Sequence, residues 1–531
     1  ENIERSTRMD SPADASSRNV NSPRRCAWLL LRTPRRKKRG IKRCRLLFLF
    51  VIMMIDSVII PVKAEAQQMA EKRGEVPLVS HWVIRFPPMK INVRQNRYFS
   101  RHIPFKILVQ GSKSLADFDY ICYNILFNEK TMIVLVLNCG SSSLKYQVLD
   151  MKDDNTNVLL AKGLVERIGL PEGDITHKPG SEKLEIHKPI PTHTEGIKSV
   201  LDLLVDEKWG VVKSLDQIDA VGHRVAHGGE TFPVSCKIDA EVIEGIEKLC
   251  ALAPLHNPAN LLGIRAVETL MPSTPQVAVF DTSFHQTMPD YAYMYAIPYE
   301  YYEKYGARRY GFHGTSHKFV AEKGCKLAGL DMNNSKVVTC HLGNGGSVTA
   351  VLNGKSVDTS MGFTPVEGVV MGTRCGNIDA GLVTFLQEKE GLDANGVNTV
   401  LNKKSGFLGV SGVSSDGRDI NNAAHNGNYR AALSQKMFAH SVKKYIGAYS
   451  AVMGGLDMVI FTGGIGENDS EARERICENL EYLGIDFNKE LNSKVRGEDV
   501  ILTNPGSKVV VATIATNEEL VIATDTMNLV K

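Results

Sequence analysis

A unit made of a strand, a glycine-rich turn and a second strand occurs twice in the sequence, about 200 residues apart. The first copy spans residues 133–149 around the turn NCGSSSLK, and the second spans residues 336–352 around the turn HLGNGGSV. Apolar and alternating runs of this length are typical of strands. Glycine and serine turns leave successive N–H and O–H donors free to face an anion. The repeat predicts an α/β chain built by internal duplication of a nucleotide-clamping βββαβα domain.

A third glycine-rich turn, residues 462–468 (TGGIGEN), follows the apolar strand 458–461 and precedes the charged helical stretch 470–480. A strand that leads through such a turn into a helix brings the backbone close to a nucleotide. None of the three turns is a Walker loop, which requires GxxxxGK(S/T) before a helix. Each turn alone could be an ordinary polar loop between two elements. Three such turns at strand ends in one chain predict a phosphate-binding site.

Charge divides the chain into two parts. Residues 1–131 contain 25 Lys and Arg against 11 Asp and Glu, whereas residues 132–531 contain 38 against 48. For the basic part three interpretations stay open: upstream sequence read in frame or a poorly defined extension, a targeting or anchoring segment, and a basic arm for nucleic acid. Its apolar run, residues 46–55, is shorter than the about 20 residues that span a bilayer.

The acidic part is long enough for two domains, because a single hydrophobic core stops growing at about 250–300 residues. Its charge argues against nucleic acid as the main partner. Its seven cysteines are scattered singly, without the paired spacing of a zinc site. Sparse, unpaired cysteines predict reduced thiols in a cytoplasmic protein.

Polar residues with catalytic potential stand beside glycines or at the ends of predicted strands. They are Arg224 in VGHRVAHGGE, Asp281 after the strand 277–280, His313 in YGFHGTSH and Arg374 in MGTRCG. An acid at the carboxyl end of an apolar strand is a common catalytic placement, and glycines clear space for a ligand around an arginine. The alternatives are a helix cap for Asp281 and surface ion pairs for the arginines. The nearby His223, His227 and His317 are interpreted as structural.

The chain ends with a predicted strand, residues 508–514, and a predicted helix over residues 517–529. Thr516 and Glu519 have the spacing of a capping box at the start of this helix. Glu518 lies in the first turn. There it either complements the helix dipole or serves as a magnesium ligand, and the residues alone leave both interpretations open.

Together, the motifs at Asn138–Lys145 (NxGSSSxK), 223–230, 310–317 (YGFHGTSH) and 371–376 resemble the acetate kinase family. The resemblance begins at Met132 and runs to the C-terminus. It implies the fold of sugar kinases, Hsp70 ATPases and actin, in which two ribonuclease-H-like α/β domains flank a nucleotide cleft. We expect these domains at 132–280 and 281–514, with the helix in 515–531 packed back on the first.

The resemblance implies reversible, Mg²⁺-dependent phosphoryl transfer from ATP to acetate, which gives acetyl phosphate and ADP. A propionate or butyrate kinase of the same fold is the alternative within this class. A non-enzymatic nucleotide-binding module like actin or Hsp70 is the alternative outside it. The family also implies a homodimer, with no nucleic acid partner and no membrane association for residues 132–531.

Individual roles carry over where motifs match. In the catalytic group, Arg224 and Arg374 would clamp the carboxylate and the phosphoryl group, and His313 would donate to the phosphoryl group. Asp281 would be the active-site acid, which either orients an arginine or assists the carboxylate and the metal. The acetate-binding residues would be Arg224, Ala226, Leu255, His256, Phe312 and Pro365. The nucleotide-binding residues would be Ser141, Ser143, Lys145, His341, Leu342, Gly343, Asn344, Gly345, Asp416, Gly417, Arg418, Gly464, Ile465, Gly466, Glu467 and Asn468. Asn138 and Glu518 would hold Mg²⁺, with Mn²⁺ as an alternative.

Two positions carry further expectations. The motif commonly reads HRVVHGGE in the family, and Ala226 replaces the second valine, at a position that lines the pocket for the acetate methyl group. A slightly larger pocket predicts measurable use of propionate beside acetate. Cys139 lies in the first glycine-rich turn, where an exposed thiol would be sensitive to oxidation.

Overall fold

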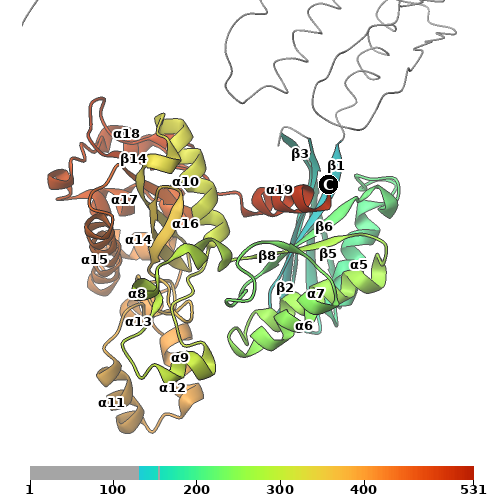
Figure 1. Cartoon of the computed structure of the whole chain (residues 1–531), viewed down its shortest axis with the longest axis horizontal. Coiled ribbons are helices and arrows are strands. Elements are labelled where there is room, and N and C mark those ends of the chain that lie inside the picture. The colour runs from blue at the N-terminus through green and yellow to red at the C-terminus, as the bar shows by residue number, and fades with distance from the viewer. Residues whose placement is uncertain (1–130, 153–155) are drawn as a thin grey trace, which may run out of the picture. The chain divides into compact units, whose positions relative to one another are not determined.

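The computed structural model describes residues 131–152 and 156–531 (Figure 1). The described residues all belong to one compact unit, residues 129–531. The three interpretations of residues 1–131 concern a segment of which only Thr131 is described. Within the described ranges, no helix is both long enough and apolar enough to cross a membrane.

Strands from the first half of this unit form an eight-stranded mixed sheet with the order β5-β4-β3-β2-β1-β6-β8-β7. They are β1 (Met132–Cys139), β2 (Ser143–Met151), β3 (Asn157–Glu166), β4 (Gly173–Pro179), β5 (Leu184–Lys188), β6 (Ala220–Val225), β7 (Cys236–Lys237) and β8 (Gln276–Phe280). β1, β6 and β8 are parallel, and the other pairs are antiparallel. The carboxyl ends of the parallel strands therefore meet at one edge.

Helices cover both faces of this sheet (Figure 1). α5 (His193–Leu204) and α7 (Asn257–Leu270) pack on one face, where Leu135 and Leu137 of β1 are buried, and α6 (Ala240–Lys248) packs beside α7. α19 (Glu518–Val530) packs on the other face against Val134 and Val136, although it is the last helix of the chain. Because alternate side chains of a strand point to opposite faces, two covered faces explain the continuously apolar sequence of β1.

A second, six-stranded sheet has the order β11-β10-β9-β12-β14-β13. Its strands are β9 (Lys336–Leu342), β10 (Gly346–Leu352), β11 (Lys355–Thr359), β12 (Met458–Thr462), β13 (Val500–Ile501) and β14 (Val510–Thr513). β9, β12 and β14 are parallel, whereas β9, β10 and β11 form an antiparallel meander. The pattern repeats that of β1, β2 and β3 beside β6, so the predicted duplication and the predicted fold class are confirmed.

The second sheet is also covered on both faces. α10 (Gly314–Ala328) packs on one face through Val320 and Ala321, and α15 (Tyr429–Val452) and α17 (Ser470–Cys477) pack on the other. The other helices here are α8 (Asp290–Tyr293), α9 (Glu300–Tyr305), α11 (Ala380–Glu390), α12 (Ala394–Lys403), α13 (Gly406–Ser411), α14 (Gly417–His425), α16 (Gly463–Asn468) and α18 (Lys489–Lys494). Short 3-10 helices occur at Leu215–Gln217, Leu249–Ala251, Ser283–Thr287, Met332–Asn334 and Glu481–Leu483.

Two local predictions were wrong in detail. Residues 463–468 form the short helix α16 rather than an open turn, and Gly463 makes the turn possible with a φ of +77°. The final helix begins at Glu518 and is capped by Asn517, whose side chain accepts a hydrogen bond from the Leu520 amide. Thr516 is therefore not the cap. Its hydroxyl is hydrogen-bonded to Ser316 instead, a tertiary partner that local spacing cannot reveal.

Candidate active site

The carboxyl ends of β1, β6 and β8 bring three predicted site residues into contact. Arg224 Nε donates to Asp281 Oδ1 at 3.0 Å, Arg224 Nη2 donates to Asp281 Oδ2, and Arg224 Nη1 donates to Asn138 Oδ1 at 3.2 Å. Both oxygens of the buried Asp281 are occupied by this guanidinium, so the residue is not a helix cap. A bidentate ion pair of this kind holds an arginine in one orientation.

Electrostatics keeps Arg224 charged inside the site. Burial by itself lowers the pKa of Arg224, but the carboxylates of Asp281 and Glu518 more than offset burial, so its pKa is raised. Glu518 stands in the first turn of α19, and burial followed by repulsion from Asp281 raises the pKa of Glu518 to about 7. Two carboxylates thus share one guanidinium, and a further cation would relieve their repulsion.

The carboxylate and amide oxygens around Arg224 are suitable ligands for a divalent cation such as Mg²⁺. Magnesium prefers carboxylate, amide and water oxygens and often completes its shell with substrate phosphates. Glu518 supplies a carboxylate and Asn138 an amide oxygen beside the same guanidinium. Residues 131–152 and 156–531 contain no group of three or more His, Cys, Asp or Glu side chains that would hold a metal alone. The protein ligands present therefore fit a cation that is shared with a nucleotide.

Two neutral histidines, one directly before α10 and one on β9, form the next part of the site. The rings of His313 and His341 stack with their centroids 4.2 Å apart. Nδ1 of His313 is hydrogen-bonded to Ser347 Oγ at 2.8 Å, and Nδ1 of His341 to Ser316 Oγ at 2.8 Å. Burial, then neighbouring histidines and arginines, holds the pKa of His313 well below 6.5. Burial likewise lowers the pKa of His341 to about 4. Both rings are uncharged at neutral pH.

Arg374 faces His313 across the turn between β9 and β10. A Cβ atom placed on Gly345 would lie 3.3 Å from Nη1 of Arg374 and 3.7 Å from Nε2 of His313. The same Arg374 Nη1 donates to the Pro365 carbonyl at 3.1 Å. The absence of a side chain at Gly345 therefore leaves open a space toward which a guanidinium and an imidazole both converge.

The second and third glycine segments lie side by side, because β9 and β12 are parallel neighbours. A Cβ atom on Gly343 would lie 3.8 Å from the Gly464 amide nitrogen. The carboxylate of Glu467 accepts hydrogen bonds from the Gly463 amide at 2.9 Å and from the Thr516 amide at 3.1 Å. The Glu467 side chain thus connects the backbone of this segment to the residues just before α19.

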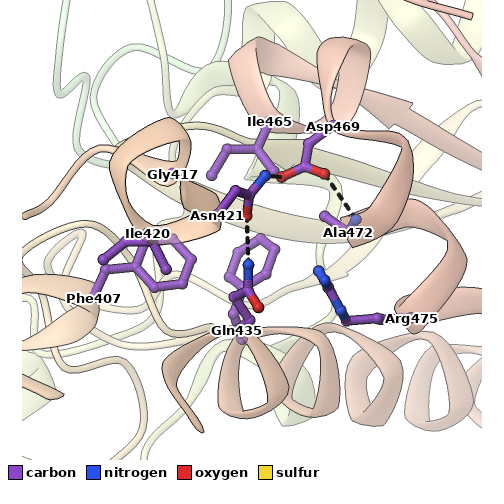
Figure 2. A pocket seen from close by; sticks show the side chains of 10 residues that line it. Phe407, Gly417, Ile420, Asn421, Gln435, Ile465, Asp469, Ala472 and Arg475 are labelled. Carbon is purple, nitrogen blue, oxygen red and sulfur yellow. Dashed lines mark hydrogen bonds between the residues drawn. The ribbon is translucent and has the colours of Figure 1, made fainter. Parts of the chain in front are cut away.

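A pocket beside the third glycine segment lies between α14, α15 and α17 (Figure 2). Its lining residues are Phe407, Gly417, Ile420, Asn421, Gln435, Phe438, Ile465, Asp469, Ala472 and Arg475. Apolar side chains occupy one part of it. The other part has a polar chain in which Gln435 Nε2 donates to Asn421 Oδ1 at 2.5 Å and Asn421 Nδ2 donates to Asp469 Oδ2 at 2.8 Å. The cavity of about 10 Å³ holds no more than one water molecule, so the lining side chains themselves fill most of this space.

Of the residues predicted around the adenosine, Gly417 and Ile465 line this pocket. Asp416 instead caps α14 and forms an ion pair with Arg418, whose side chain is 88% exposed. Sequence reasoning missed Asn421, Gln435 and Phe438, because they lie on helices in no recognisable motif. The strongly amphipathic sequence of α14 was the only available signal, and it indicates packing as readily as binding.

The first glycine-rich turn differs from expectation at two residues. Lys145, predicted to contact phosphates, forms an ion pair with Glu519. Cys139 is buried against Gly263 rather than exposed, and burial raises the pKa of its thiol to about 12. The expected sensitivity of Cys139 to oxidation was therefore wrong, because a thiol this hard to ionise is a poor nucleophile. Ser141 is exposed and Ser143 half-buried at the same turn.

The predicted acetate-binding residues come from several elements. Ala226 is buried, and its amide donates to Asn260 Oδ1 at 3.0 Å. Burial and the positive charges of Arg224 and Arg374 lower the pKa of His256, which places that ring within electrostatic reach of both arginines. Phe312 is buried, whereas Leu255 is 58% exposed.

The histidines interpreted as structural have buried partners. His223 is hydrogen-bonded to Gln276, and His317 to Thr339 and Ser347. Nδ1 of His227 accepts from the Gly229 amide.

An arginine oriented by a buried carboxylate suits the charge neutralisation that transfer of a phosphoryl group needs. Fold and site together therefore define a phosphotransferase. A model of the acetokinase family matches residues 133–524, and the chain belongs to this family.

Relatives match along nearly their whole length. The acetate kinase of Caldanaerobacter subterraneus subsp. tengcongensis is 58% identical over 402 residues, which are 75% of this chain and 99% of the relative. The crystal structure of Porphyromonas gingivalis acetate kinase is 50% identical, covers 75% of this chain and all of its own, and has a TM-score of 0.73. A propionate kinase from Francisella tularensis subsp. tularensis is 41% identical over the same share of this chain, with a TM-score of 0.70.

Proposed function

We propose that this chain catalyses reversible transfer of the γ-phosphoryl group of ATP to acetate, giving acetyl phosphate and ADP. The observation that carries the proposal is the pair of arginines: Arg224 is held by Asp281, while Arg374 and His313 converge on the open space at Gly345. A substrate carboxylate and a phosphoryl group both suit planar guanidinium forks. The relatives named acetate kinase support this choice of acceptor.

The proposed chemistry depends on positioning and charge neutralisation. Acetate is ionised at pH 7, so no general base is needed, and Arg224 and Arg374 offset the negative charge on the two reacting groups. His313 and His341, both uncharged, donate hydrogen bonds to the transferring group, where preorganised donors stabilise the transition state. Asn138 and Glu518 would hold Mg²⁺, which neutralises phosphate charge when bound. Gly417 and Ile465 would lie beside the adenine of a bound nucleotide.

A hydroxamate assay tests the proposal directly. The full chain, ATP and Mg²⁺ are incubated with acetate, propionate or butyrate, and acyl phosphate is trapped with hydroxylamine. We expect acetate to be the best substrate. ATP hydrolysis without trapped acyl phosphate would support the nucleotide-binding module instead, and a preference for propionate or butyrate would reassign the acceptor.

Substitution of Glu518 by Gln is expected to raise the Mg²⁺ concentration for half-maximal rate by about tenfold or more, because a neutral amide is a weaker ligand than a carboxylate. The change keeps the size of the side chain at the start of α19. Asp525→Asn, two turns later on the same helix, is the matched control and should leave the Mg²⁺ dependence unchanged. Equal Mg²⁺ titrations of the Glu518 variant and the wild type would exclude Glu518 as a ligand.

The wild type is expected to phosphorylate propionate at a measurable rate, since Ala226 is smaller than the valine common in the family. Ala226→Val should lower kcat/KM for propionate relative to acetate by about tenfold, which is the effect of one or two methyl groups in an apolar pocket. Initial rates with both acids provide the ratio. An unchanged ratio would show that position 226 does not line the acyl pocket.

A homodimer and a cytoplasmic location stay predictions. The exposed side chains of Tyr291, Tyr299, Tyr301 and Tyr305 support the first, because large aromatic side chains are enriched at protein interfaces. Light scattering of the purified chain would measure its oligomeric state.

A further inference from the structure

The candidate active site contains a continuous chain of hydroxyl and imidazole groups behind His313. Thr339 Oγ1 lies 2.7 Å from Nδ1 of His317, Nε2 of His317 lies 2.7 Å from Ser347 Oγ, and Ser347 Oγ lies 2.8 Å from Nδ1 of His313. Thr339, His317 and Ser347 are fully buried. No role in nucleotide or acetate contact was assigned to any of the three.

Proton counting leaves two states in which Ser347 donates its hydroxyl hydrogen to one of the two rings. Burial, then the neighbouring His285 and His341, holds the pKa of His317 well below its ordinary value, so both imidazoles are neutral and carry one N–H each. Ser347 has one hydroxyl hydrogen to share between two rings. If His317 donates to Ser347, then Ser347 donates to His313, and His313 carries its proton on Nε2. If every donor is reversed, Nε2 of His313 presents a lone pair.

The surroundings of Nε2 select between the two states when a phosphorylated ligand is bound. Nε2 of His313 and Nη1 of Arg374 converge on the same space at Gly345. Among the described residues, none is hydrogen-bonded to Nε2 of His313. Phosphate oxygens only accept hydrogen bonds, and Arg374 only donates them. An anion in this space is held by both groups only if His313 has its hydrogen on Nε2.

We propose that Ser347 and His317 are positioning residues that hold His313 as an Nε2–H donor toward the transferring phosphoryl group. The inference rests on the proposed function, because it needs a phosphoryl group at this place. A related arrangement serves the stacked ring: Ser316 Oγ lies 2.8 Å from both Nδ1 of His341 and Oγ1 of Thr516. Each of the two histidines thus has a hydroxyl group at Nδ1, which leaves Nε2 for the ligand.

The kinetic test removes the hydroxyl of Ser347 in the full chain. Ser347→Ala is expected to lower kcat about 30-fold and to leave KM for ATP and acetate within about threefold. Loss of one preorganised donor costs more than this, but the ring itself stays in place. Thr349→Val is the matched control: Thr349 is two residues further along the same strand, is fully buried, and is hydrogen-bonded through its hydroxyl to Thr359 rather than to a histidine. In a His313→Asn background, Ser347→Ala should have no further effect on kcat.

A spectroscopic test does not depend on turnover. The full chain is labelled with ring-¹⁵N histidine, and the His313 signals are assigned by their loss in His313→Asn. With Mg·ATP bound in the absence of acetate, we expect a protonated Nε2 and an unprotonated Nδ1 in the wild type, and a mixture of tautomers in Ser347→Ala. A protonated Nδ1 in the wild type, or equal kcat losses in Ser347→Ala and Thr349→Val, would overturn the proposal. If the wild type forms no acyl phosphate, the proposed function fails, while the tautomer measurement still decides the positioning role.

Discussion

Substitution of Asp281 by Asn is expected to lower kcat with acetate by about 100-fold to 1000-fold. Both carboxylate oxygens of Asp281 accept hydrogen bonds from Arg224, and the pair is partly closed off from solvent. An amide has one acceptor oxygen and no charge, so the guanidinium loses its fixed orientation and part of its charge compensation. Misplacing one preorganised group at a phosphoryl-transfer site costs this much in rate. The hydroxamate assay measures the loss.

A control separates the loss of rate from a loss of folding. Asp219→Asn is the matched substitution: Asp219 Oδ2 accepts a hydrogen bond from the Ile133 amide, just before the first residue of β6, away from the carboxyl edge. It should leave kcat within about twofold. Thermal unfolding of both variants shows whether they are folded. A folded Asp281→Asn chain with near-normal kcat would show that Asp281 does not orient Arg224 for the reaction.

The second large effect concerns acid stability. The free energy of unfolding is expected to fall by at least about 5 kcal/mol between pH 7 and pH 5, because buried histidines must stay neutral in the folded state. His223, His227 and His285 account for about this much, since burial lowers the pKa of each to about 4, with a contribution from Arg308 at His227. The buried His313, His317 and His341, whose pKa values are also lowered, add to the loss. In the unfolded chain their pKa is about 6.5. Protons therefore bind the unfolded chain first, and stability is lost as pH falls from about 6.5 toward 4.

Urea unfolding of the full chain at pH 7, 6 and 5 measures this loss. His285→Gln should reduce the loss by about 2 kcal/mol, since it removes one of the groups that bind a proton only on unfolding. Its ring is hydrogen-bonded to Ser356 and to the Phe312 carbonyl, so some stability at pH 7 will also be lost. His440→Gln, at an exposed position, is the control and should leave the pH dependence unchanged. Identical pH dependence in all three chains would contradict the prediction.

Contiguous motifs predicted which side chains lie together where each of them stands at the end of one strand. Asn138, Arg224 and Asp281 each stand at or just after the carboxyl end of a parallel strand, and parallel strands in one sheet bring these ends together. A partner of Lys145 could not be predicted in this way. Lys145 has a phosphate-binding motif around it, and the start of α19 also brings Glu519 to its ammonium group from more than 370 residues away, so its contact with phosphates stays a prediction.

Burial was the second source of error. Cys139 stands in a turn of small polar residues, which predicts exposure, but the thiol points toward α7 and lies against Gly263. The pocket between α14, α15 and α17 was also missed in part, because Asn421 and Gln435 are brought together by two helices that carry no nucleotide motif. Neither result follows from local sequence, since both depend on how separate elements pack.

The sequence by itself determined the duplicated α/β fold, the family and the residue types that the reaction needs, because strand periodicity and glycine turns are local properties of the chain. Only the tertiary structure decided how those residues act. It paired Arg224 with Asp281, stacked His313 on His341, and placed Ser347 and His317 behind His313. The physical reason is that charge, protonation and orientation depend on burial and on partners distant in sequence, which the order of residues does not specify.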